Sequence, residues 1–380
     1  RNNQLNNNTG SIYITHSTFS SAVTTFVNDI DTSNTVNGKP IIYWVNQHDK
    51  IVPQDAGHVG LVNCTNIKVQ NLNLAGNSRG LMLVYTTHST IAQNTVTNSS
   101  GDGIYVYKSS NNNMSENTIT NNGNYGIGLF YSSNNIISEN TITANDQTGI
   151  YLTNASNNII NRNKITLNNE GIHLYSSGTN NSVVGNTITE NNEYGVSLAW
   201  TGNNFVSENF IEKNGKGILV DDSSKNRIIG NTVKENNGWA IRLEDGQRDN
   251  IIYHNYFIDN KVEEGLQVSI PGLWEPGVWE PGNPNVWDDG EKGNYWSDYT
   301  TRYTNATEIE DSGIGDTPFY INPNNIDYHP IMRDNVIPEF PTWIITPLFI
   351  VTTLSAVIVY RKLTKQTKSY KVLFGFGVKI

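Results

Sequence analysis

A repeat of about 23 residues limits what this chain can fold into. An Asn that precedes an x-Ile or x-Val pair recurs, with steps of 22 to 24 residues, at Asn71, Asn94, Asn117, Asn140, Asn163, Asn186, Asn209, Asn231 and Asn255. A Gly followed by apolar-x-apolar keeps step with it at Gly80, Gly103, Gly126, Gly149, Gly171, Gly195 and Gly217, with Ala240 in the same register. Two markers in step identify an array of stacked units.

Each unit has the pattern of short strands. In "GIYLT" (149–153) and "GILVD" (217–221) the apolar residues alternate, and no segment of the unit has a helical period. Three strands separated by Asn, Gly and Ser corners predict one turn of a parallel β-coil. Asn and Gly tolerate the left-handed backbone of such corners. Stacked coils would place equivalent Asn amides about 4.8 Å apart, close enough for hydrogen-bonded ladders. We therefore expect each Ile to fill the interior and each Asn to turn a corner.

A leucine-rich repeat is the main structural alternative, because its period overlaps and it also carries an Asn before an apolar residue. Two turn clusters in each unit and the preference for Ile and Val over Leu argue against it.

The repeats resemble those of the NosD-like group of right-handed β-helix proteins, within the wider set of carbohydrate-binding and sugar-hydrolase β-helix proteins. The resemblance covers about residues 40–332, and its most specific parts are "NVWDDGEKGNYWSDY" (285–299) and "DSGIGDTPFYINPNNIDYHPIM" (311–332). It implies an all-β, right-handed, single-stranded parallel β-helix of the pectin-lyase-like kind. A role in copper-site maturation rests on the family name alone, because the seven histidines are scattered along the chain.

The expected organisation has six parts. They are irregular N-terminal coils and a cap (1–66), regular repeats (67–270), a Trp-, Asp- and Gly-rich cap with an insertion (271–336), a "PEFP"-containing linker (337–342), a transmembrane helix (343–360) and a basic cytoplasmic tail (361–380). In the C-terminal cap, aromatic residues would close the apolar interior of the last coil.

The end of the chain predicts a membrane anchor. Residues 343–360 contain 18 residues without a charge, enough to cross a membrane core, and basic residues follow. The positive-inside rule places the tail in the cytoplasm and the coils outside. The "PEFP" motif (338–341) makes this end resemble archaeal PEF-type sorting tails. We expect a cell-surface, extracellular β-helix, and seven Asn-x-Ser/Thr sites are compatible with a glycoprotein.

The net charge of the chain limits the classes of partner that it can bind. The chain has 25 bases and 35 acids, and the six bases after Tyr360 leave the rest of the chain near −16. Such a surface repels phosphate backbones, which argues against nucleic acid and favours cations or neutral sugars. Cys64 is the only cysteine, so neither a disulfide framework nor a thiolate metal cluster is possible.

Alternation after each Gly marker predicts an outward column at the second and the fourth position and a further one at the fifth, where the strand leaves the face. Aromatic side chains in these columns offer flat apolar surfaces for sugar rings. The candidates for glycan binding are Tyr85, Tyr105, Tyr107, Phe130, Tyr131, Tyr151, Tyr175 and Trp200. The alternative is that these rings stabilise the sheet by stacking on one another.

Carboxylates follow at the other end of the same columns. Asp221, Asp222, Glu244 and Asp245 would lie on adjacent coils, and oxygen ligands of this kind suit Ca²⁺, the one cofactor the sequence suggests. With Arg242 they resemble the working parts of β-helix polysaccharide lyases, and paired acids also serve glycoside hydrolases. These residues are therefore the catalytic candidates.

We interpret the sequence as a surface-anchored, non-catalytic protein that binds a polysaccharide or cell-envelope glycan or has a structural role there. A β-helix polysaccharide lyase or glycoside hydrolase is the alternative, and a NosD-like accessory role for a copper site is the third hypothesis.

Overall fold

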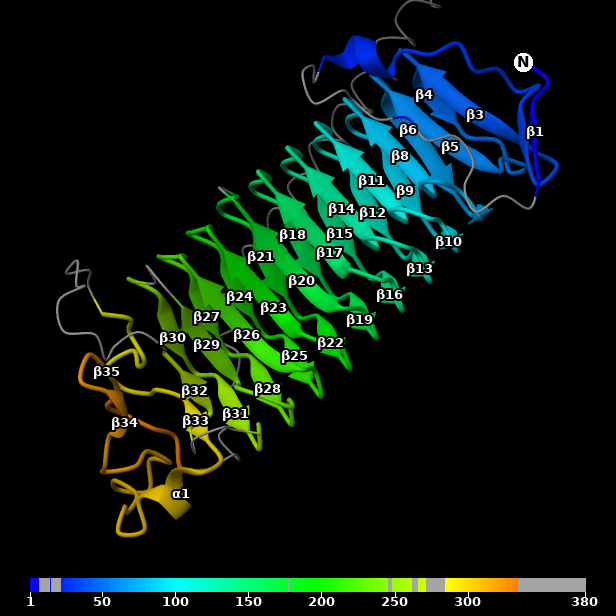
Figure 1. Cartoon of the computed structure of the whole chain (residues 1–380). Coiled ribbons are helices and arrows are strands. Elements are labelled where there is room, and N and C mark those ends of the chain that lie inside the picture. Colours follow the sequence, from blue (N-terminus) through cyan, green and yellow to red (C-terminus); the bar gives the residue numbers. More distant parts are fainter. Residues whose placement is uncertain are drawn as a thin grey trace, which may run out of the picture. The chain divides into compact units, whose positions relative to one another are not determined.

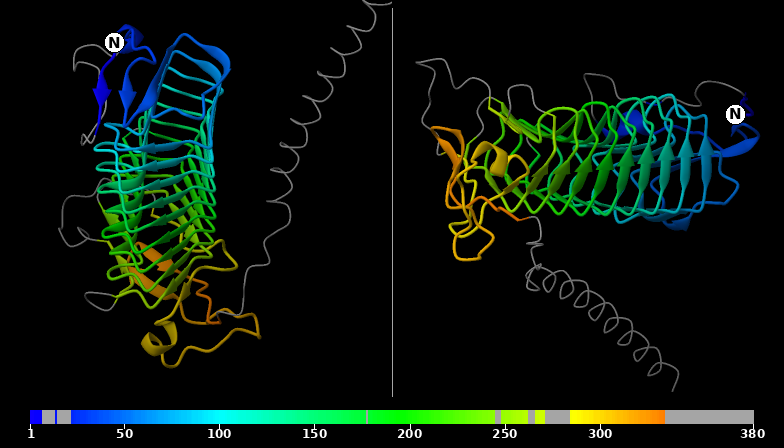
Figure 2. Two further views of the ribbon diagram at one scale, coloured as in Figure 1. Left: turned by 90° about the vertical axis from the view of Figure 1, so that its right-hand side faces the viewer. Right: turned by 90° about the horizontal axis from the view of Figure 1, so that it is seen from below.

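Short apolar strands between polar corners fold into coils that stack one on another (Figure 1). The computed structural model describes residues 1–6, 14, 22–176, 178–244, 248–261, 266–270 and 284–333. Figure 2 shows the coils as successive loops in chain order. Most coils contribute one strand to each of three sheets, which are parallel except for one antiparallel pair at the N-terminal end, and this confirms the predicted parallel β-coil. The helices described are the single turns η1 (Val23–Phe26) and α1 (Tyr299–Arg302).

The three sheets run along the stack. The long sheet contains β1 (Gln4–Leu5), β2 (Thr35–Val36), β3 (Lys39–Val45), β5 (His58–Val62), β8 (Leu81–Val84), β11 (Ile104–Tyr107), β14 (Ile127–Phe130), β17 (Thr148–Thr153), β20 (Glu170–Tyr175), β23 (Tyr194–Ala199), β26 (Lys216–Asp221), β29 (Ile241–Glu244) and β32 (Val268–Ser269). The second sheet contains β7 (Asn73–Ala75), β10 (Thr95–Thr97), β13 (Thr118–Thr120), β16 (Thr141–Thr143), β19 (Lys164–Thr166), β22 (Thr187–Thr189), β25 (Phe210–Glu212), β28 (Thr232–Lys234), β31 (Tyr256–Ile258) and β33 (Tyr295–Trp296). The third contains β4 (His48–Ile51), β6 (Thr65–Gln70), β9 (Thr90–Ala92), β12 (Asn113–Ser115), β15 (Ile136–Ser138), β18 (Ile159–Asn161), β21 (Ser182–Val184), β24 (Phe205–Ser207), β27 (Arg227–Ile229) and β30 (Ile251–Tyr253). A hairpin of β34 (Phe319–Asn322) and β35 (Asn325–Asp327) follows.

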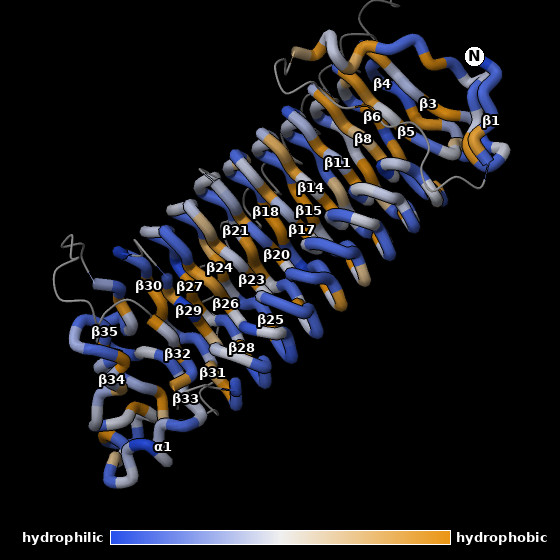
Figure 3. Tube along the Cα trace, viewed as in Figure 1, coloured by the Kyte–Doolittle hydropathy of each residue, from blue (hydrophilic) through white to orange (hydrophobic). Residues whose placement is uncertain are grey.

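The interior is a file of aliphatic side chains. In the second and third sheets the middle residue of each three-residue strand points inward. Ile119, Ile142 and Ile165 do so in successive strands of the second sheet, and each of these is fully buried. Figure 3 shows hydrophobic stretches along the strands and hydrophilic ones at the corners. Because successive coils bury the same positions against one another, no coil has a core of its own.

Buried asparagines line three corners of the stack. The predicted ladder is present at Asn94, Asn117, Asn140, Asn163, Asn186, Asn209, Asn231, Asn255 and Asn294. A second runs through Asn112, Asn135, Asn158, Asn181, Asn204, Asn226, Asn250 and Asn285, and a third through Asn122, Asn145, Asn168, Asn191, Asn214, Asn236 and Asn260. Only the first of the three ladders was predicted from the sequence.

Each ladder amide bonds in both directions along the stack. Asn163 Oδ1 accepts hydrogen bonds from the backbone N and the Nδ2 of Asn140, at 3.0 and 2.9 Å. Its own Nδ2 donates to Asn186 Oδ1 at 3.0 Å and to the carbonyl oxygen of Ile137 at 2.9 Å. The side chain is 1% exposed, so these bonds replace the water that the amide loses on burial.

The left-handed backbone lies one residue before the first ladder, not on it. The residues with positive φ are Gln93, Glu116, Glu139, Arg162, Glu208 and His254, together with Gly185 and Gly230. The expectation that the ladder Asn turns the corner is therefore wrong for these coils. Asn71 is itself a corner residue, with φ 57°. In its coil Leu72 occupies the position that the ladder Asn takes in later coils, and Leu72 N donates to Asn94 Oδ1. Buried hydrogen bonding, not backbone conformation, accounts for the Asn that is repeated in the first ladder.

The N-terminal segment packs over the outside of the long sheet at its first coils. Phe26, from η1, is fully buried and contacts Tyr107 with ring centroids 5.7 Å apart. Tyr43 Oη donates to the carbonyl oxygen of Phe26. These residues belong to a second hydrophobic cluster, separate from the coil interior, that also contains Tyr105.

Aromatic side chains close the C-terminal end of the interior. Trp287 and Trp296 are 1% exposed, and Trp296 stacks on Phe319 at 4.2 Å. The first two ladders end on acceptors of this cap. Trp296 Nε1 and Asn294 N donate to Asp327 Oδ2, at 2.9 and 2.7 Å. Burial raises the pKa of Asp327 to about 7, although these donors favour its ionised form.

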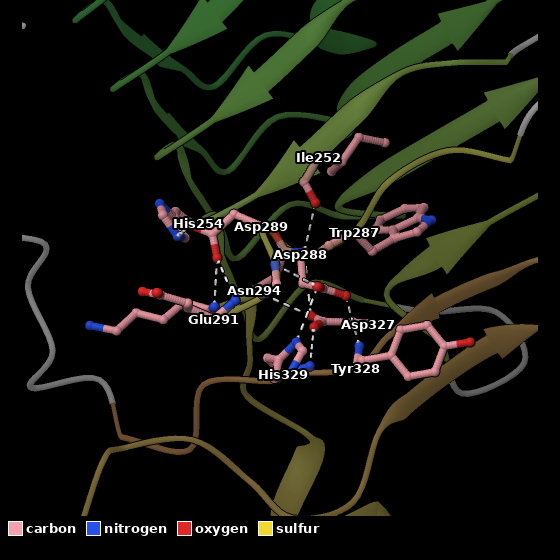
Figure 4. Close-up of polar contacts among 12 residues, drawn as sticks. Ile252, His254, Trp287, Asp288, Asp289, Glu291, Asn294, Asp327, Tyr328 and His329 are labelled. Carbon is pink, nitrogen blue, oxygen red and sulfur yellow. Dashed lines mark hydrogen bonds and ion pairs between the residues drawn. The ribbon is translucent and has the colours of Figure 1, made fainter.

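Two His–Asp pairs form polar contacts in the same cap (Figure 4). His254 Nε2 lies 3.0 Å from Asp289 Oδ2, and His329 Nδ1 lies 3.1 Å from Asp288 Oδ1. His254 and His329, scattered in the sequence, thus reach one end of the fold. Burial lowers the pKa of His254.

Residues 343–360, expected to cross a membrane, lie outside the described residues. Within the described part of the chain, no helix combines the length and the apolar character that a membrane crossing requires.

We expect Asn163→Ala to lower the free energy of unfolding by about 2 to 5 kcal/mol, because it leaves the buried backbone N of Asn140 without an acceptor and removes one of the two acceptors of Asn140 Nδ2. Urea denaturation measures the change. Asn73→Ala is the control, since Asn73 is exposed on a neighbouring sheet, and should cost less than about 0.5 kcal/mol. Equal effects of the two changes would contradict the role assigned to the ladders.

Asp327 predicts a pH dependence of stability. Its pKa is 3.8 when unfolded and about 7 when folded, so the folded state binds the proton more tightly. The stability it contributes is complete below about pH 4 and is lost as pH rises through about 7. Compared with Asp327→Asn, the wild type should therefore lose up to about 4 kcal/mol of relative stability over this range. Denaturation curves at several pH values test this, and a pH-independent difference would refute it.

Candidate functional site

The outer face of the long sheet carries the columns predicted from the Gly markers. Strand register places Tyr105, Gly128, Tyr151 and His173 in one column and Tyr107, Phe130, Thr153 and Tyr175 in the next. Residues at the fifth position, among them Tyr131 and Trp200, share a left-handed conformation. The predicted alignment is confirmed.

A further column, at the residue before each Gly marker, was missed. It contains Arg79, Asp102, Tyr125, Thr148, Glu170, Tyr194, Lys216 and Trp239. Its side chains touch those of the second-position column: Tyr125 stacks on Tyr151 with ring centroids 4.3 Å apart and an interplanar angle of 6°. Burial, with Tyr151 close by, raises the pKa of Tyr125 to about 12. The 23-residue step at this position was the sequence signal that could have shown the column.

The N-terminal end of this face is covered. Tyr105 and Tyr107 are 5% and 3% exposed, within the cluster that contains Phe26. The prediction of exposed rings is wrong for these two residues, because the N-terminal segment lies on them. Tyr85 is half-buried against the same cluster. Here the alternative role, packing, applies.

An ion pair that was not predicted from the sequence lies beside the covered rings. Arg79 stacks on Tyr105, with its guanidinium carbon 3.6 Å from the ring centroid, and its Nε lies 3.6 Å from Asp102 Oδ2. Asn124 Nδ2 donates to Asp102 at 2.6 Å. Burial raises the pKa of Asp102, and Arg79 opposes this.

The remaining aromatic residues form an open strip, defined as Phe130, Tyr131, Tyr151, Tyr175 and Trp200. Tyr151 lies 5.8 Å from Phe130 and 6.3 Å from Tyr175, centroid to centroid, and Tyr175 lies 5.2 Å from Trp200. Tyr131 and Trp200 are 54% and 52% exposed. The strip therefore presents continuous ring surface to solvent over four successive coils.

Tyr131 and Trp200 have φ 52°, a conformation that is costly for bulky side chains. The equivalent position in the coil of β17 holds Asn154, which tolerates it better. Two large, exposed rings therefore occupy positions that Asn would fill with less strain. Strain of this kind is often retained for function.

A His–carboxylate pair lies in the middle of the strip. His173 Nδ1 is 2.8 Å from Glu170 Oε2, and the imidazole lies edge-on between Tyr151 and Tyr175, with centroids 5.5 and 5.6 Å away. His173 Nε2 and Ser197 Oγ are buried and without a hydrogen-bond partner in the described part of the chain. They belong to register-paired residues of β20 and β23. Glu170 keeps the imidazole oriented, while the second ring nitrogen is shielded from solvent.

The acidic end of the face is only partly as expected. Asp221 and Glu244 are register partners, but Glu244 forms an ion pair with Arg242, whose guanidinium carbon lies 4.5 Å from the Trp239 centroid. Asp245 lies outside the described residues. Among the residues described, no three His, Cys, Asp or Glu side chains gather closely enough to hold a metal ion. The calcium site at Asp221, Asp222, Glu244 and Asp245 stays a prediction.

Comparison with known proteins bears on the fold. Residues 57–209 match the family described as "Right handed beta helix region", and residues 176–301 match "Periplasmic copper-binding protein (NosD)". No curated protein matches the chain.

Solved structures of similar fold include two A-modules of Azotobacter vinelandii mannuronan C-5 epimerases. AlgE6 has 16% identity, coverage of 65% of this chain and 79% of that chain, and a TM-score of 0.48. AlgE4 has 18% identity, coverage of 65% and 81%, and the same TM-score of 0.48. DFA-IIIase from Arthrobacter chlorophenolicus has 11% identity, coverage of 62% and 68%, and a TM-score of 0.47. The parallel sheets and the match of residues 57–209 support a right-handed β-helix fold, and residues 176–301 are similar to the NosD family.

Proposed function

We propose that this protein binds an extended glycan along the open strip, non-catalytically. The observation that carries the proposal is the pair of exposed rings, Tyr131 and Trp200, held at left-handed positions on either side of Tyr151 and Tyr175. Exposed aromatic faces suit the apolar faces of sugar rings. Coils repeat at about 4.8 Å, close to the length of one sugar residue in an extended chain, so one ring can serve one sugar.

Binding accounts for the site better than catalysis does. A lyase or hydrolase needs an acid and a base that reach the sugar. His173 Nε2 is buried, and Glu244 is ion-paired with Arg242. The enzymatic alternative therefore has less support than glycan binding.

Trp200→Asn and Tyr131→Asn test the proposal. Each should weaken glycan binding about 3- to 10-fold, the effect of one stacked ring. Because Asn relieves the strained backbone, each should leave the free energy of unfolding unchanged or raise it by about 1 kcal/mol. A glycan array with and without Ca²⁺ finds the ligand, calorimetry measures its affinity and urea denaturation the stability.

Phe210→Ala is the matched control, because Phe210 is an exposed ring on the second sheet. It should leave glycan binding unchanged. If no glycan on a broad panel binds, or if the Asn variants lose stability but not affinity, the proposed function is wrong.

We also propose a cell-surface location, with residues 343–360 as the membrane anchor and the "PEFP" motif as part of an archaeal-type sorting tail. The support is the uncharged stretch followed by bases. The family name "Periplasmic copper-binding protein (NosD)" is compatible with a location outside the cytoplasm.

Leu354→Arg tests the anchor, since a central Arg disfavours insertion by about 2.5 to 3.5 kcal/mol. Wild type should remain with membranes after an alkaline wash, whereas the variant should be released. Leu354→Ile is the control and should behave as the wild type does. Release of the wild type by the same wash would refute anchoring.

A further inference from the structure

We infer that the glycan site selects amino sugars and neutral sugars and rejects uronates and sulfated sugars. This inference rests on the proposed function and names the sugar class for the same face. It comes from the charged side chains that share the face with the rings.

Acids outnumber bases on the open part of the face. From Tyr125 onward, the described residues of its four columns include the acids Glu170, Asp221, Asp222 and Glu244 and the bases Lys216 and Arg242. Asp222 directly follows Trp200 in the fifth-position column, where backbone N of Trp200 donates to the carbonyl oxygen of Asp221. In the fifth-position column, negative charge therefore begins one coil beyond Trp200, the last ring of the open strip.

Both bases are already engaged by acids. Lys216 Nζ lies 3.3 Å from Glu193 Oε2 and 4.8 Å from the Tyr194 ring centroid. Arg242 is paired with Glu244 and stacked on Trp239. An incoming uronate would have to compete with these carboxylates for each cation. It would also meet the negative field of the four acids in these columns.

At the covered end of the face, the aromatic rings lie next to cations. Arg79 lies on Tyr105, and Lys108 Nζ lies 5.5 and 5.6 Å from the centroids of Tyr85 and Tyr107. Arg79 lies against the covered ring of Tyr105, whereas Lys108 directly precedes Tyr131 in the fifth-position column, where Lys108 N donates to the carbonyl oxygen of Phe130. From Tyr151 to Trp200, the rings of the open strip are next to carboxylates instead, with Glu170 at His173 and Asp222 one coil beyond Trp200.

Carboxylates beside aromatic rings suit two kinds of sugar. A protonated amino group gains a charge-assisted hydrogen bond, and hydroxyl pairs of a neutral sugar donate to the carboxylate oxygens. Two like charges about 4 Å apart repel by about 1 kcal/mol in water and by more at a partly desolvated surface. Two or three acids are therefore enough for a tenfold preference, which corresponds to about 1.4 kcal/mol.

The experiment compares hexamers of glucosamine, N-acetylglucosamine and mannuronate by calorimetry on the full chain. Glucosamine should bind at least as tightly as N-acetylglucosamine, and mannuronate about tenfold or more weakly. The difference in affinity between the glucosamine and mannuronate hexamers should decrease as the ionic strength rises from a low value to about 0.15 M.

Asp221→Asn/Asp222→Asn assigns the preference to this face. It should reduce the ratio of glucosamine to mannuronate affinity at least about 3-fold and change N-acetylglucosamine binding less than about twofold. Asp222 has φ 41°, which Asn tolerates. Glu116→Gln/Glu208→Gln removes the same charge from corners next to the first Asn ladder and should leave the ratio unchanged.

The outcomes separate the two proposals. Mannuronate binding as tight as glucosamine binding, lost in Trp200→Asn, would overturn the selectivity and leave the glycan site in place. An unchanged ratio in the Asp221/Asp222 variant would also overturn it. Failure of all three hexamers to bind would overturn the inference and remove support from the proposed function.

Discussion

Buried amide hydrogen bonds between equivalent asparagines hold the coils in register. A coil of three short strands buries too little apolar surface to be stable alone, and its corners leave backbone groups without partners. The ladder side chains satisfy those groups, as Asn163 does for Asn140 and Ile137. Since each amide requires its copy in the next coil, a slip by one residue would break all three ladders and turn the interior side chains outward. The flat face with its aligned rings depends on this register.

The sequence predicted the parts of this structure that depend on period. The 23-residue step gave the parallel coils, the inward Ile residues and the columns through Tyr151 and Tyr175. The period did not distinguish ladder asparagines from corner asparagines, because Asn suits both a buried hydrogen-bonded position and a left-handed backbone. Asn163 occupies a buried ladder position, whereas Asn71 occupies a left-handed corner. Only the burial of the side chain distinguishes them.

The site was less predictable because its boundaries come from segments outside the repeat. Nothing in the period indicates that Phe26 lies against Tyr107, more than 80 residues away in the sequence, so the covered rings looked equivalent to the open ones. The pairing of Glu170 with His173 crosses the Gly marker, where the strict alternation used to assign faces does not hold. Repeats predict columns, whereas caps and pairings across a column depend on the particular side chains.

The ladders have a direction. Each ladder Nδ2 donates a hydrogen bond toward the following coil. The last donors therefore need an acceptor that does not itself donate to a further coil, and the Asp327 carboxylate is this acceptor for Asn294 and Trp296. The terminator is thus chemically distinct from the units it ends. A duplication or loss of whole 23-residue units between the first coils and this terminator would preserve every bond type at both boundaries. Evolution can therefore lengthen or shorten the molecule by gene-level copying, and with it the number of sugar-sized steps along its surface, without redesigning either end.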